Sequence, residues 1–502
     1  MTSRSDTAAY PPCPSPFNLT AHVLTHAARL PDKIALSIVK PTGAERWSYA
    51  RMEQAILGCA TGLLVSGLTP GDRLLMRVGN TVEFPVAFLA AITVGIVPIP
   101  TSSQLTEREV EVVAQITKPA AILHDGVTPC PSHPRILSTA DMADWATLPP
   151  ASYVFGDPDR MAYIIFTSGT SGTPRAVCHA HRAIWARGMM IEGWYGLTEA
   201  DRLMHAGAFN WTYTLGTGLL DPWTKGATAL IPAQGVEHAQ IPLLLKRNEA
   251  SIFAAAPGVY RNILKSDTID LPKLRHGLSA GEKLPASIRD AWYNRTGTRI
   301  YEAFGMSECS TFISTAPGDP EVAETSLGWP QPGRRVAILG DTDPVPAGQT
   351  GMIAIHKSDP GLMLGYLDQP EATQAKYSGD WFLSGDTGEQ TENGDILYHG
   401  RADDLMNAGG YRVSPLEVEA ALMPFPGLHE VGVTDIEIKA DTRVIAAYYV
   451  ADTDLDEEAL KSWAATRLAR YKQPRVYRRV AAMPRNANGK LVRRGLPDLS
   501  PL

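Results

Sequence analysis

The chain has 502 residues, a formal net charge of −7 and an apolar fraction of 44%. This length predicts at least two domains, and the acidic balance argues against a broad nucleic-acid-binding surface, which needs a basic excess. The five cysteines are scattered without a C-x-x-C pair. That distribution excludes a disulfide framework or a zinc-binding motif and favours the cytoplasm.

The N-terminal stretch MTSRSDTAAYPPCPSP is polar and rich in proline, so we expect a frayed tail there and no signal peptide. The uncharged run Phe84–Thr106 is long enough to raise the question of a membrane span. Three prolines and a glycine interrupt this run. We therefore predict no membrane span, but a buried helix over Pro85–Val94 and a short strand over Ile96–Ile99.

Helical and strand-like segments alternate through residues 1–400, which predicts an α/β fold with sheets covered by helices. In chain order we expect a helix over Met52–Ser66, strands over Arg73–Arg77, Ala120–Leu123 and Ala227–Ile231, and a helix over Ile241–Arg247. Around Pro332–Ile355 short β-type runs are separated by Gly, Pro and Asp. They predict a small barrel-like region.

The last hundred residues predict a smaller α+β domain. Its expected elements are a helix over Ser414–Met423, with Ser414 as N-cap and Pro415 at the first position, strands over Val431–Ile438 and Val444–Val450, and a helix over Glu457–Tyr471. The expected organisation is an N-terminal domain over residues 1–400, a hinge over 401–404 and a C-terminal domain over 405–502.

The segment Tyr163–His181 contains an apolar β-type run that breaks into a loop of Thr, Ser and Gly. Seven of the eight residues Thr167–Pro174 are of these three types. Glycine lets the backbone approach a ligand closely, and successive N–H groups can converge on an anion, so the loop predicts a polyphosphate site. A flexible linker is the alternative. The Walker pattern is excluded, because Pro174 and Arg175 stand where Gly-Lys is required.

Four further segments each read, when taken singly, as turns, solvated charges or a hairpin tip. They are SAGEKL at 279–284, YEAFGMSE at 301–308, SGDTG at 384–388 with GRADD at 400–404, and RNANGK at 485–490. In this order and spacing, and together with the loop, they resemble the adenylate-forming superfamily of acyl-CoA synthetases, luciferases and peptide-synthetase adenylation domains. The resemblance extends from about Phe17 to Arg494.

The resemblance implies an AMP-forming acid–thiol ligase, which joins a carboxylate to the α-phosphate of ATP and passes the acyl group to a thiol. It implies ATP, Mg²⁺ and coenzyme A as cofactors. The implied ATP site comprises Thr167, Ser168, Gly169, Thr170, Ser171, Gly172, Thr173, Arg175, Gly281, Glu282, Phe304, Ser307, Asp386, Arg401 and Arg412. Among these, Gly281, Glu282 and Phe304 match adenine-lining positions, and Asp386 and Arg401 match ribose contacts.

The same resemblance implies catalytic roles for Lys490, Glu308 and Arg401. Lys490 matches the lysine that bridges the carboxylate and the α-phosphate, and Glu308 matches the Mg²⁺ ligand. Asp403 matches the hinge about which the small domain rotates, and Gly409 and Gly410 match the glycines beside the pantetheine channel. Two departures leave the branch of the family open: Arg175 replaces a lysine, and Asn407 replaces another lysine of aryl-CoA and luciferase-type members.

The acyl pocket implied by the resemblance comprises Phe209, Trp211, Ala280 and Gly305. Acetyl-CoA synthetases carry a tryptophan at the position of Gly305, so this pocket is expected to accept more than acetate. Asn210 is neutral in the segment where amino-acid-activating members use an aspartate, and we expect no carrier-protein domain after the chain. These features favour a CoA ligase for an aromatic or a short-to-medium aliphatic monocarboxylic acid.

Three alternatives stay open: an enzyme that loads a carrier protein, a non-catalytic sensor on the same fold, and an oxidative, luciferase-like activity without positive support in the sequence. The expected partner is a small carboxylic acid, and nucleic acid is not expected. A homodimer is left open. Acetylation of Lys490 would remove the charge needed for adenylation, so a lysine acetyltransferase and deacetylase are further candidate partners.

Overall fold

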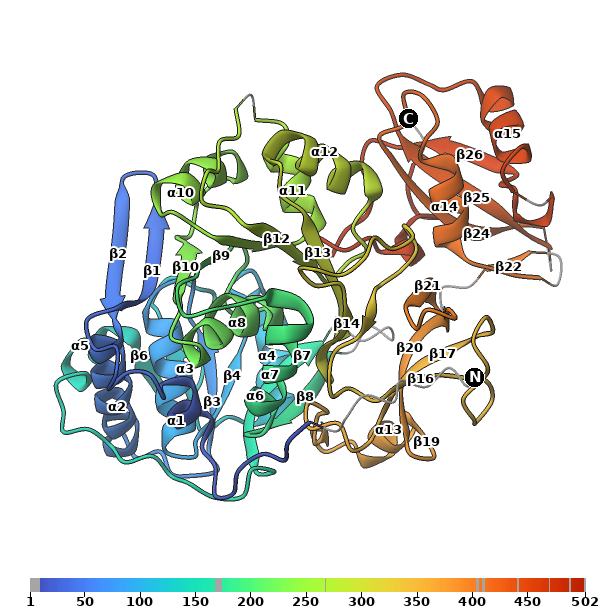
Figure 1. The fold of residues 1–502 in the computed structure, drawn as a ribbon. Coiled ribbons are helices and arrows are strands. Elements are labelled where there is room, and N and C mark those ends of the chain that lie inside the picture. Colours follow the sequence, from blue (N-terminus) through green and yellow to red (C-terminus); the bar gives the residue numbers. More distant parts are fainter. Residues whose placement is uncertain are drawn as a thin grey trace. The chain divides into compact units, whose positions relative to one another are not determined.

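The computed structural model describes residues 10–167, 174–266, 268–402, 406–408, 411–439, 442–468, 470–486 and 489–500 (Figure 1). Within these ranges the chain divides into two compact units. The large unit comprises residues 10–335 and 355–382, and the small unit comprises residues 336–354 and 383–500. Both units contain helices and sheets, which confirms the predicted mixed α/β class.

The large unit contains a mixed sheet with nine strands among the described residues, in the order β15-β14-β13-β12-β11-β9-β10-β1-β2. The strands from β13 to β1 in this order are parallel, and β14, β15 and β2 are antiparallel additions at the two edges. Their bounds are β1 (Ile34–Lys40), β2 (Gly43–Ser48), β9 (Arg202–His205), β10 (Thr228–Pro232), β11 (Ile252–Ala255), β12 (His276–Ala280), β13 (Ile300–Met306), β14 (Ser310–Ser314) and β15 (Trp329–Pro330).

A second, parallel sheet has the order β4-β3-β5-β6. Its strands are β3 (Arg73–Arg77), β4 (Val97–Pro100), β5 (Ala121–His124) and β6 (Ile136–Ser138). Helices α2 (Tyr49–Val65) and α3 (Glu83–Thr93) share one apolar core with Leu36 and Ile38 of the first sheet and with Leu74 and Met76 of the second. These helices therefore bury apolar side chains against both sheets.

The other face of the nine-stranded sheet is covered as well. Ala229 and Ile231 of β10 belong to the core of α2 and α3, whereas Leu230 between them packs with the helices α10 (Ile241–Arg247), α11 (Pro257–Ile263) and α12 (Ala286–Thr296). Successive side chains of a strand point to opposite faces, and strands that are buried on both faces read as continuous apolar runs. The sequence TALIP of β10 is such a run.

The large unit has further α-helices among its described residues. They are α1 (Leu19–Val23), α4 (Glu107–Thr117), α5 (Met142–Trp145), α6 (Ala183–Ala186), α7 (Gly188–Met190), α8 (Thr212–Leu215), α9 (Asp221–Thr224) and α13 (Pro370–Gln374). A small antiparallel sheet in the order β18-β8-β7 completes the unit, with β7 (Met161–Thr167), β8 (Arg175–Ala180) and β18 (Gly365–Tyr366).

Where the sequence predicts a barrel-like region, the structure has one five-stranded sheet in the order β16-β17-β20-β19, with β21 paired to β20. Its strands are β16 (Val336–Leu339), β17 (Thr350–His356), β19 (Tyr377–Ser378), β20 (Trp381–Gln390) and β21 (Ile396–Arg401). Most of this sheet belongs to the small unit, whereas β19 and the adjoining ends of β17 and β20 belong to the large unit. The residues that follow form the short pair β22 (Met406–Ala408) and β23 (Tyr411–Val413), and a sheet of β24 (Glu430–Lys439), β25 (Thr442–Val450) and β26 (Val476–Arg479). Helices α14 (Pro415–Leu422) and α15 (Glu457–Ala465) pack against it.

Most of the predicted elements are confirmed, with two corrections. The last helix is shorter than predicted: α15 ends at Ala465, not at Tyr471. Ser414 precedes α14 as predicted but forms no side-chain capping bond, because its hydroxyl donates to the His399 carbonyl instead. Among the described residues, no helix is long and apolar enough to cross a bilayer.

Candidate active site

The carboxyl ends of the neighbouring parallel strands β12 and β13 bring together two of the predicted site segments. Ala280, the last residue of β12, is in register with Ala303 of β13. Gly281 follows with a φ of 96°, a conformation that glycine adopts without strain. Phe304 lies on the adjacent strand and contacts Phe312 edge-to-face. Ligands of such sheets bind beyond the carboxyl ends of the strands, so Gly281, Glu282 and Phe304 lie where the ATP site is expected.

The turn between β13 and β14 carries Ser307 and Glu308 and is fixed by contacts from other elements. His179 Nε2 on β8 donates to the Ser307 carbonyl at 2.9 Å. The backbone N–H of Met363 donates to the Glu308 carbonyl at 2.8 Å. Ser310, which ends the turn, has a φ of 71°, an uncommon value for a residue other than glycine. These contacts connect the backbone of the turn to β8 and to residue 363.

Glu308 contacts the predicted phosphate-binding region through Tyr366 of β18. The Tyr366 hydroxyl donates to Glu308 Oε1 at 2.6 Å, and the Arg175 guanidinium lies over the Tyr366 ring at 5.2 Å from its centroid. Burial, with the Glu308 carboxylate adding to it, raises the pKa of Tyr366, so the phenol stays protonated. Because Thr167 and Arg175 face each other in register, this cation stands where the loop 168–173 leaves and rejoins the sheet.

The residues around Glu308 fit a magnesium ion that is held mainly by its substrate. Mg²⁺ in nucleotide sites takes one or two carboxylates and completes its shell with phosphate oxygens and water. Within the described ranges, no three His, Cys, Asp or Glu side chains gather as ligands of one ion. One carboxylate oxygen of Glu308 accepts the hydrogen bond from Tyr366. Glu308 therefore fits a magnesium site with a single protein carboxylate.

A buried ion pair supports the same turn from inside the large unit. Arg187 Nη2 lies 2.6 Å from Asp221 Oδ2, and its Nε donates to Asp221 Oδ1 at 2.7 Å. The Tyr195 hydroxyl donates to the same carboxylate at 2.7 Å, and Arg187 Nη1 donates to the Ser310 hydroxyl. A Cβ at Gly216 would lie 2.1 Å from Arg187 Nη2, so the guanidinium fits only because residue 216 is glycine.

Replacing Asp221 by asparagine is expected to destabilise the large unit by about 3–5 kcal/mol, because it leaves the Arg187 cation buried without its counter-charge. Arg187→Met should destabilise the large unit less than Asp221→Asn does, because an unpaired carboxylate can bind a proton whereas a guanidinium cannot lose one. The double variant R187M/D221N should recover much of the loss. Urea denaturation of the four proteins tests this order, and a double variant as unstable as D221N would contradict it.

A second ion pair fixes the Gly281–Glu282 turn to β13. Lys283 Nζ donates to Glu302 Oε2 and to the Ser326 carbonyl, each at 2.7 Å. Glu302 Oε1 accepts the backbone N–H of Leu284 at 2.8 Å. The two side chains are only 20% and 10% exposed, so solvent screens this pair weakly. The pair therefore sets the position of the turn expected to line the adenine.

Lys283→Met or Glu302→Gln should raise the KM for ATP about 5- to 30-fold, equivalent to 1–2 kcal/mol, with a smaller change in kcat. The charge-reversed double variant K283E/E302K should recover part of the affinity. Steady-state kinetics at saturating acid and CoA measures this effect. Lys246→Met is the matched control, because the Lys246–Asp270 pair is more than half exposed and lies on the surface. An unchanged KM for ATP in K283M would contradict the assigned role.

The four predicted acyl-site residues lie in different surroundings. Phe209 is 1% exposed and stacks on Phe84 in the core at 5.3 Å between centroids. Trp211 contacts Tyr213 edge-to-face at 5.1 Å, and Ala280 packs in the same cluster. A Cβ at Gly305 would lie 2.3 Å from the Ser310 carbonyl oxygen, because the β13–β14 bulge brings this backbone close. Gly305 is therefore required by the neighbouring strand, whatever its effect on the pocket.

In the small unit, the predicted ribose-binding pair lies side by side on β20 and β21. Asp386 and Arg401 are in register, and Arg401 Nη1 lies 3.4 Å from Asp386 Oδ2. The Tyr398 hydroxyl donates to Asp386 Oδ1 at 2.8 Å. Burial, reinforced by Asp386, raises the pKa of Tyr398 well above its usual value, so this phenol remains a donor. Asp386 is thus held as an acceptor in a fixed orientation.

Lys490 is exposed and follows a tight turn of the small unit. The Asn486 backbone N–H donates to the Lys490 carbonyl at 2.9 Å, and the Lys490 N–H donates to Asn486 Oδ1 at 3.0 Å. Gly489 has a φ of 83° within the turn. The segment is therefore the tight turn that its sequence indicates, with the lysine at a defined place on the backbone.

Several predicted positions lie outside the described residues: Ser168, Gly169, Thr170, Ser171, Gly172 and Thr173 of the loop, Asp403 at the hinge, and Gly409 and Gly410. The backbone of Arg412 pairs with Asn407 in β23 and β22, but its side chain is not described. Their roles stay predictions.

Sequence reasoning did not find Tyr366, the Arg187–Asp221 pair or the Lys283–Glu302 pair. Lys283 stands in the segment SAGEKL and Glu302 in the segment YEAFGMSE. Their opposite charges are the signal in the sequence that could have indicated this pair. Tyr366 and Asp221 are recognisable only from the three-dimensional contacts described above.

Comparison with known proteins identifies the family of the chain. The model of the AMP-binding enzyme family matches residues 23–367, and that of the AMP-binding enzyme C-terminal domain matches residues 417–490. The chain belongs to this family of adenylate-forming enzymes, and it is an AMP-forming acid–thiol ligase. Enzymes of this kind use ATP and coenzyme A.

Two curated relatives are similar over nearly their whole length. The benzoate–CoA ligase of Thauera aromatica is 30% identical over 486 residues, covering 90% of this chain and 90% of the relative. The mitochondrial acyl-coenzyme A synthetase ACSM3 of Mus musculus is 28% identical over 489 residues, covering 90% and 84%.

Two solved structures share the fold. A benzoate CoA ligase from Burkholderia xenovorans LB400 has a TM-score of 0.84 and 26% identity, with 96% of this chain and 99% of that chain covered. ATP-bound MatB from Rhodopseudomonas palustris has a TM-score of 0.86 and 25% identity, with 96% and 98% covered.

Proposed function

We propose that the chain is an acid–CoA ligase for an aromatic or a short-to-medium aliphatic monocarboxylic acid. It adenylates the acid with release of pyrophosphate and then transfers the acyl group to CoA with release of AMP. The observation that carries this proposal is the chain Arg175–Tyr366–Glu308, which sets a cation and a carboxylate beside the strands that frame the Gly-rich loop. Relatives named as benzoate–CoA ligase and acyl-CoA synthetases support it.

In the first step the residues of this chain position two anions against each other. Arg175 and the loop donors bind the terminal phosphates, and the Ser307 hydroxyl contacts a phosphate oxygen. Asp386 accepts the ribose hydroxyls, while Tyr398 and Arg401 hold its carboxylate in place. Lys490 bridges the attacking carboxylate and the α-phosphate. Such fixed donors act on charge that develops during the reaction, which is the main task of an adenylating site.

Glu308 would hold Mg²⁺, which would neutralise part of the phosphate charge. For the second step we propose that the C-terminal domain rotates about Asp403, which withdraws Lys490. Gly409 and Gly410 would then line the path of the pantetheine. A functional division at residues 401–404 would let the C-terminal domain present the lysine in the first step and a thiol-binding face in the second.

A screen for ATP- and CoA-dependent AMP release over aromatic and C2–C8 acids tests the proposed function. We expect AMP and an acyl-CoA thioester from at least one acid, and pyrophosphate exchange without CoA. Pyrophosphate exchange without any CoA thioester would favour an enzyme that loads a carrier protein. Absence of exchange with every acid would favour a non-catalytic sensor.

We further propose that Lys490 is a site of reversible acetylation. Its side chain is exposed on a surface turn, and acetylation removes the positive charge that adenylation needs. Mass spectrometry of the protein from cells grown on different carbon sources should show partial acetylation, and acetylated protein should lose pyrophosphate exchange. Unmodified Lys490 under all conditions would contradict this proposal.

A further inference from the structure

Tyr366 of β18 lies between two charged side chains of opposite sign. Its hydroxyl donates to Glu308 Oε1 at 2.6 Å, and the Arg175 guanidinium lies over its ring at 5.2 Å from the centroid. Burial is the largest cause of the raised pKa of the phenol, and Glu308 raises this pKa further whereas Arg175 lowers it. Within the described part of the chain, no ion pair joins Arg175 to Glu308. The phenol stands where these two charges could otherwise meet.

Two of the three side chains belong to strand β8 or to its partner strand. Arg175 is the first residue of β8, and β18 pairs with β8. On either side of Tyr366, the backbone N–H groups of Leu364 and Leu367 donate to carbonyls of β8 at 2.8 and 2.9 Å. The Tyr366 side chain is only 4% exposed. Its ring is therefore a fixed wall beside the Arg175 guanidinium.

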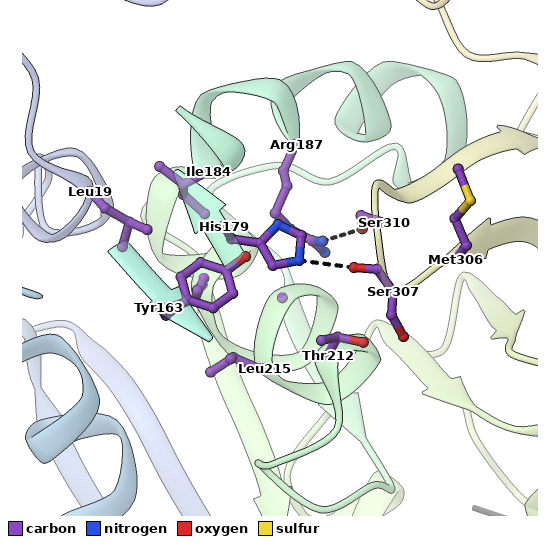
Figure 2. A pocket seen from close by; sticks show the side chains of 12 residues that line it. Leu19, Tyr163, His179, Ile184, Arg187, Thr212, Leu215, Met306, Ser307 and Ser310 are labelled. Atoms are coloured by element: carbon purple, nitrogen blue, oxygen red, sulfur yellow. Dashed lines mark hydrogen bonds between the residues drawn. The ribbon is translucent and has the colours of Figure 1, made fainter. Parts of the chain in front are cut away.

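The turn that carries Glu308 is bonded to the same strand. His179 of β8 donates through Nε2 to the Ser307 carbonyl at 2.9 Å, and Arg187 donates to the Ser310 hydroxyl, and Figure 2 shows both bonds. These bonds hold the turn on both sides of Glu308. The carboxylate, the phenol and the guanidinium thus have β8 as a common support.

A neutral donor at this place has a different effect from a cation. The phenol satisfies one oxygen of Glu308 and leaves the negative charge of the carboxylate in place, and no hydrogen bond from a described residue reaches the other oxygen. A guanidinium on the same carboxylate would form a charge-assisted pair that cancels both charges. Arg175 and Glu308 are half-buried, so salt would screen such a pair only weakly. ATP and Mg²⁺ would have to break the pair in order to bind.

We propose that Tyr366 is a positioning residue that keeps Arg175 and Glu308 apart. The ring separates the two charges, and the hydroxyl orients the Glu308 carboxylate without neutralising it. The cation is thereby available to the phosphates of ATP, and the carboxylate to Mg²⁺. This inference rests on the roles that the proposed function gives to Arg175 and Glu308.

Calorimetric titration with ATP in the absence of divalent metal tests the separation of the charges. Tyr366→Ala removes the ring, so Arg175 should pair with Glu308, and the Kd of metal-free ATP should rise about 10-fold. Adding Glu308→Gln to Y366A removes the competing charge and should restore the affinity. The gain from E308Q should be about 5-fold or more larger in Y366A than in the wild type, where Arg175 is already available.

The double variant separates this role from a structural one, because E308Q would not repair damage to the fold. An equal effect of E308Q in the two backgrounds would overturn the separating role of Tyr366. The titrations contain no acid, so their outcome does not depend on which acid the enzyme uses. A wild type that binds no ATP would overturn the proposed function, and this inference with it.

Tyr366→Phe keeps the ring and removes only the hydroxyl, and it decides the question of orientation even where Y366A does not fold. The Kd of metal-free ATP should stay within about 3-fold of the wild type, whereas the gain in ATP affinity on adding Mg²⁺ should fall about 5- to 10-fold, because Glu308 loses its orienting donor. Tyr153→Phe is the matched control: it removes a phenol that donates to the Glu53 carboxylate at 3.1 Å elsewhere in the large unit, and both affinities should stay unchanged. An undiminished effect of Mg²⁺ in Y366F would overturn the orienting role.

Discussion

Replacement of Lys490 by alanine is expected to slow formation of the acyl-adenylate by about 10²–10³-fold, the usual cost of removing one preorganised donor from a charged transition state. The reason is local. The turn that ends at Lys490 is closed by two hydrogen bonds with Asn486, so its backbone presents the cation at a defined place. The neighbouring cation Arg485 is engaged with the Gly489 carbonyl and with Glu430.

Two measurements separate this role from a general loss of structure. Exchange of pyrophosphate into ATP should fall in K490A, whereas transfer of the acyl group from prepared acyl-adenylate to CoA should be nearly unchanged. Lys461→Ala is the matched control, because Lys461 is an exposed lysine of the same unit that pairs only with Glu457 and Glu458 of its own helix among the described contacts. Near-normal exchange in K490A would refute the catalytic assignment.

The large unit is expected to lose stability steeply as the pH falls from about 6.5 towards 4. Four of its histidines are less than 5% exposed. Burial, the largest cause in each case, lowers the pKa of His179 and His276 to about 4 and that of His181 and His205 to about 3. In the unfolded chain the same groups bind protons near pH 6.5.

The sign follows from proton counting. Below about pH 6.5 the histidines bind protons in the unfolded state but not in the folded state, so acid favours unfolding. The large unit therefore keeps its full free energy of unfolding only above that pH. At pH 5 each histidine contributes a loss of about 2 kcal/mol. Four such losses are comparable with the whole stability of a domain, about 5–15 kcal/mol.

Urea midpoints measured between pH 7 and pH 5 test this expectation. His276→Gln should reduce the pH dependence by the share of one histidine, whereas His429→Gln, an exposed histidine of the small unit, should leave it unchanged. The pH window separates this effect from acid titration of carboxylates, which sets in below about pH 5. A flat midpoint down to pH 5 would contradict the prediction.

The sequence predicted those elements best whose residues carry strong local signals. The strand β3 matches its prediction over Arg73–Arg77 because four buried residues follow one another in it. The helix α10 matches over Ile241–Arg247 because a proline near its start and two basic residues at its end mark both ends. Periodicity did not reveal the end of α15: Leu468 is buried beyond the helix, so the apolar pattern continues where the helix does not.

The sequence motifs predict the segments of the site but not the contacts that support them. Roles for Glu308, Asp386 and Lys490 can be predicted, since such residues stand at fixed points of motifs along the chain. Tyr366 and Asp221 support the site across 58 and 34 residues of sequence, through contacts with Glu308 and Arg187. Neither contact has a local signature. Aromatic spacing likewise could not tell a pocket wall from a core position, and Phe209 illustrates the difficulty, because its ring stacks on Phe84.

The close approach at Gly305 limits how this enzyme can evolve or be engineered. A side chain added there would collide with the Ser310–Thr311 backbone, which cannot swing aside as a flexible side chain could. A tryptophan at this position would therefore demand a new conformation of the hairpin that also carries Glu308, and selection for a smaller substrate would meet a loss of catalysis first. Laboratory evolution of acid preference should accordingly leave residue 305 unchanged.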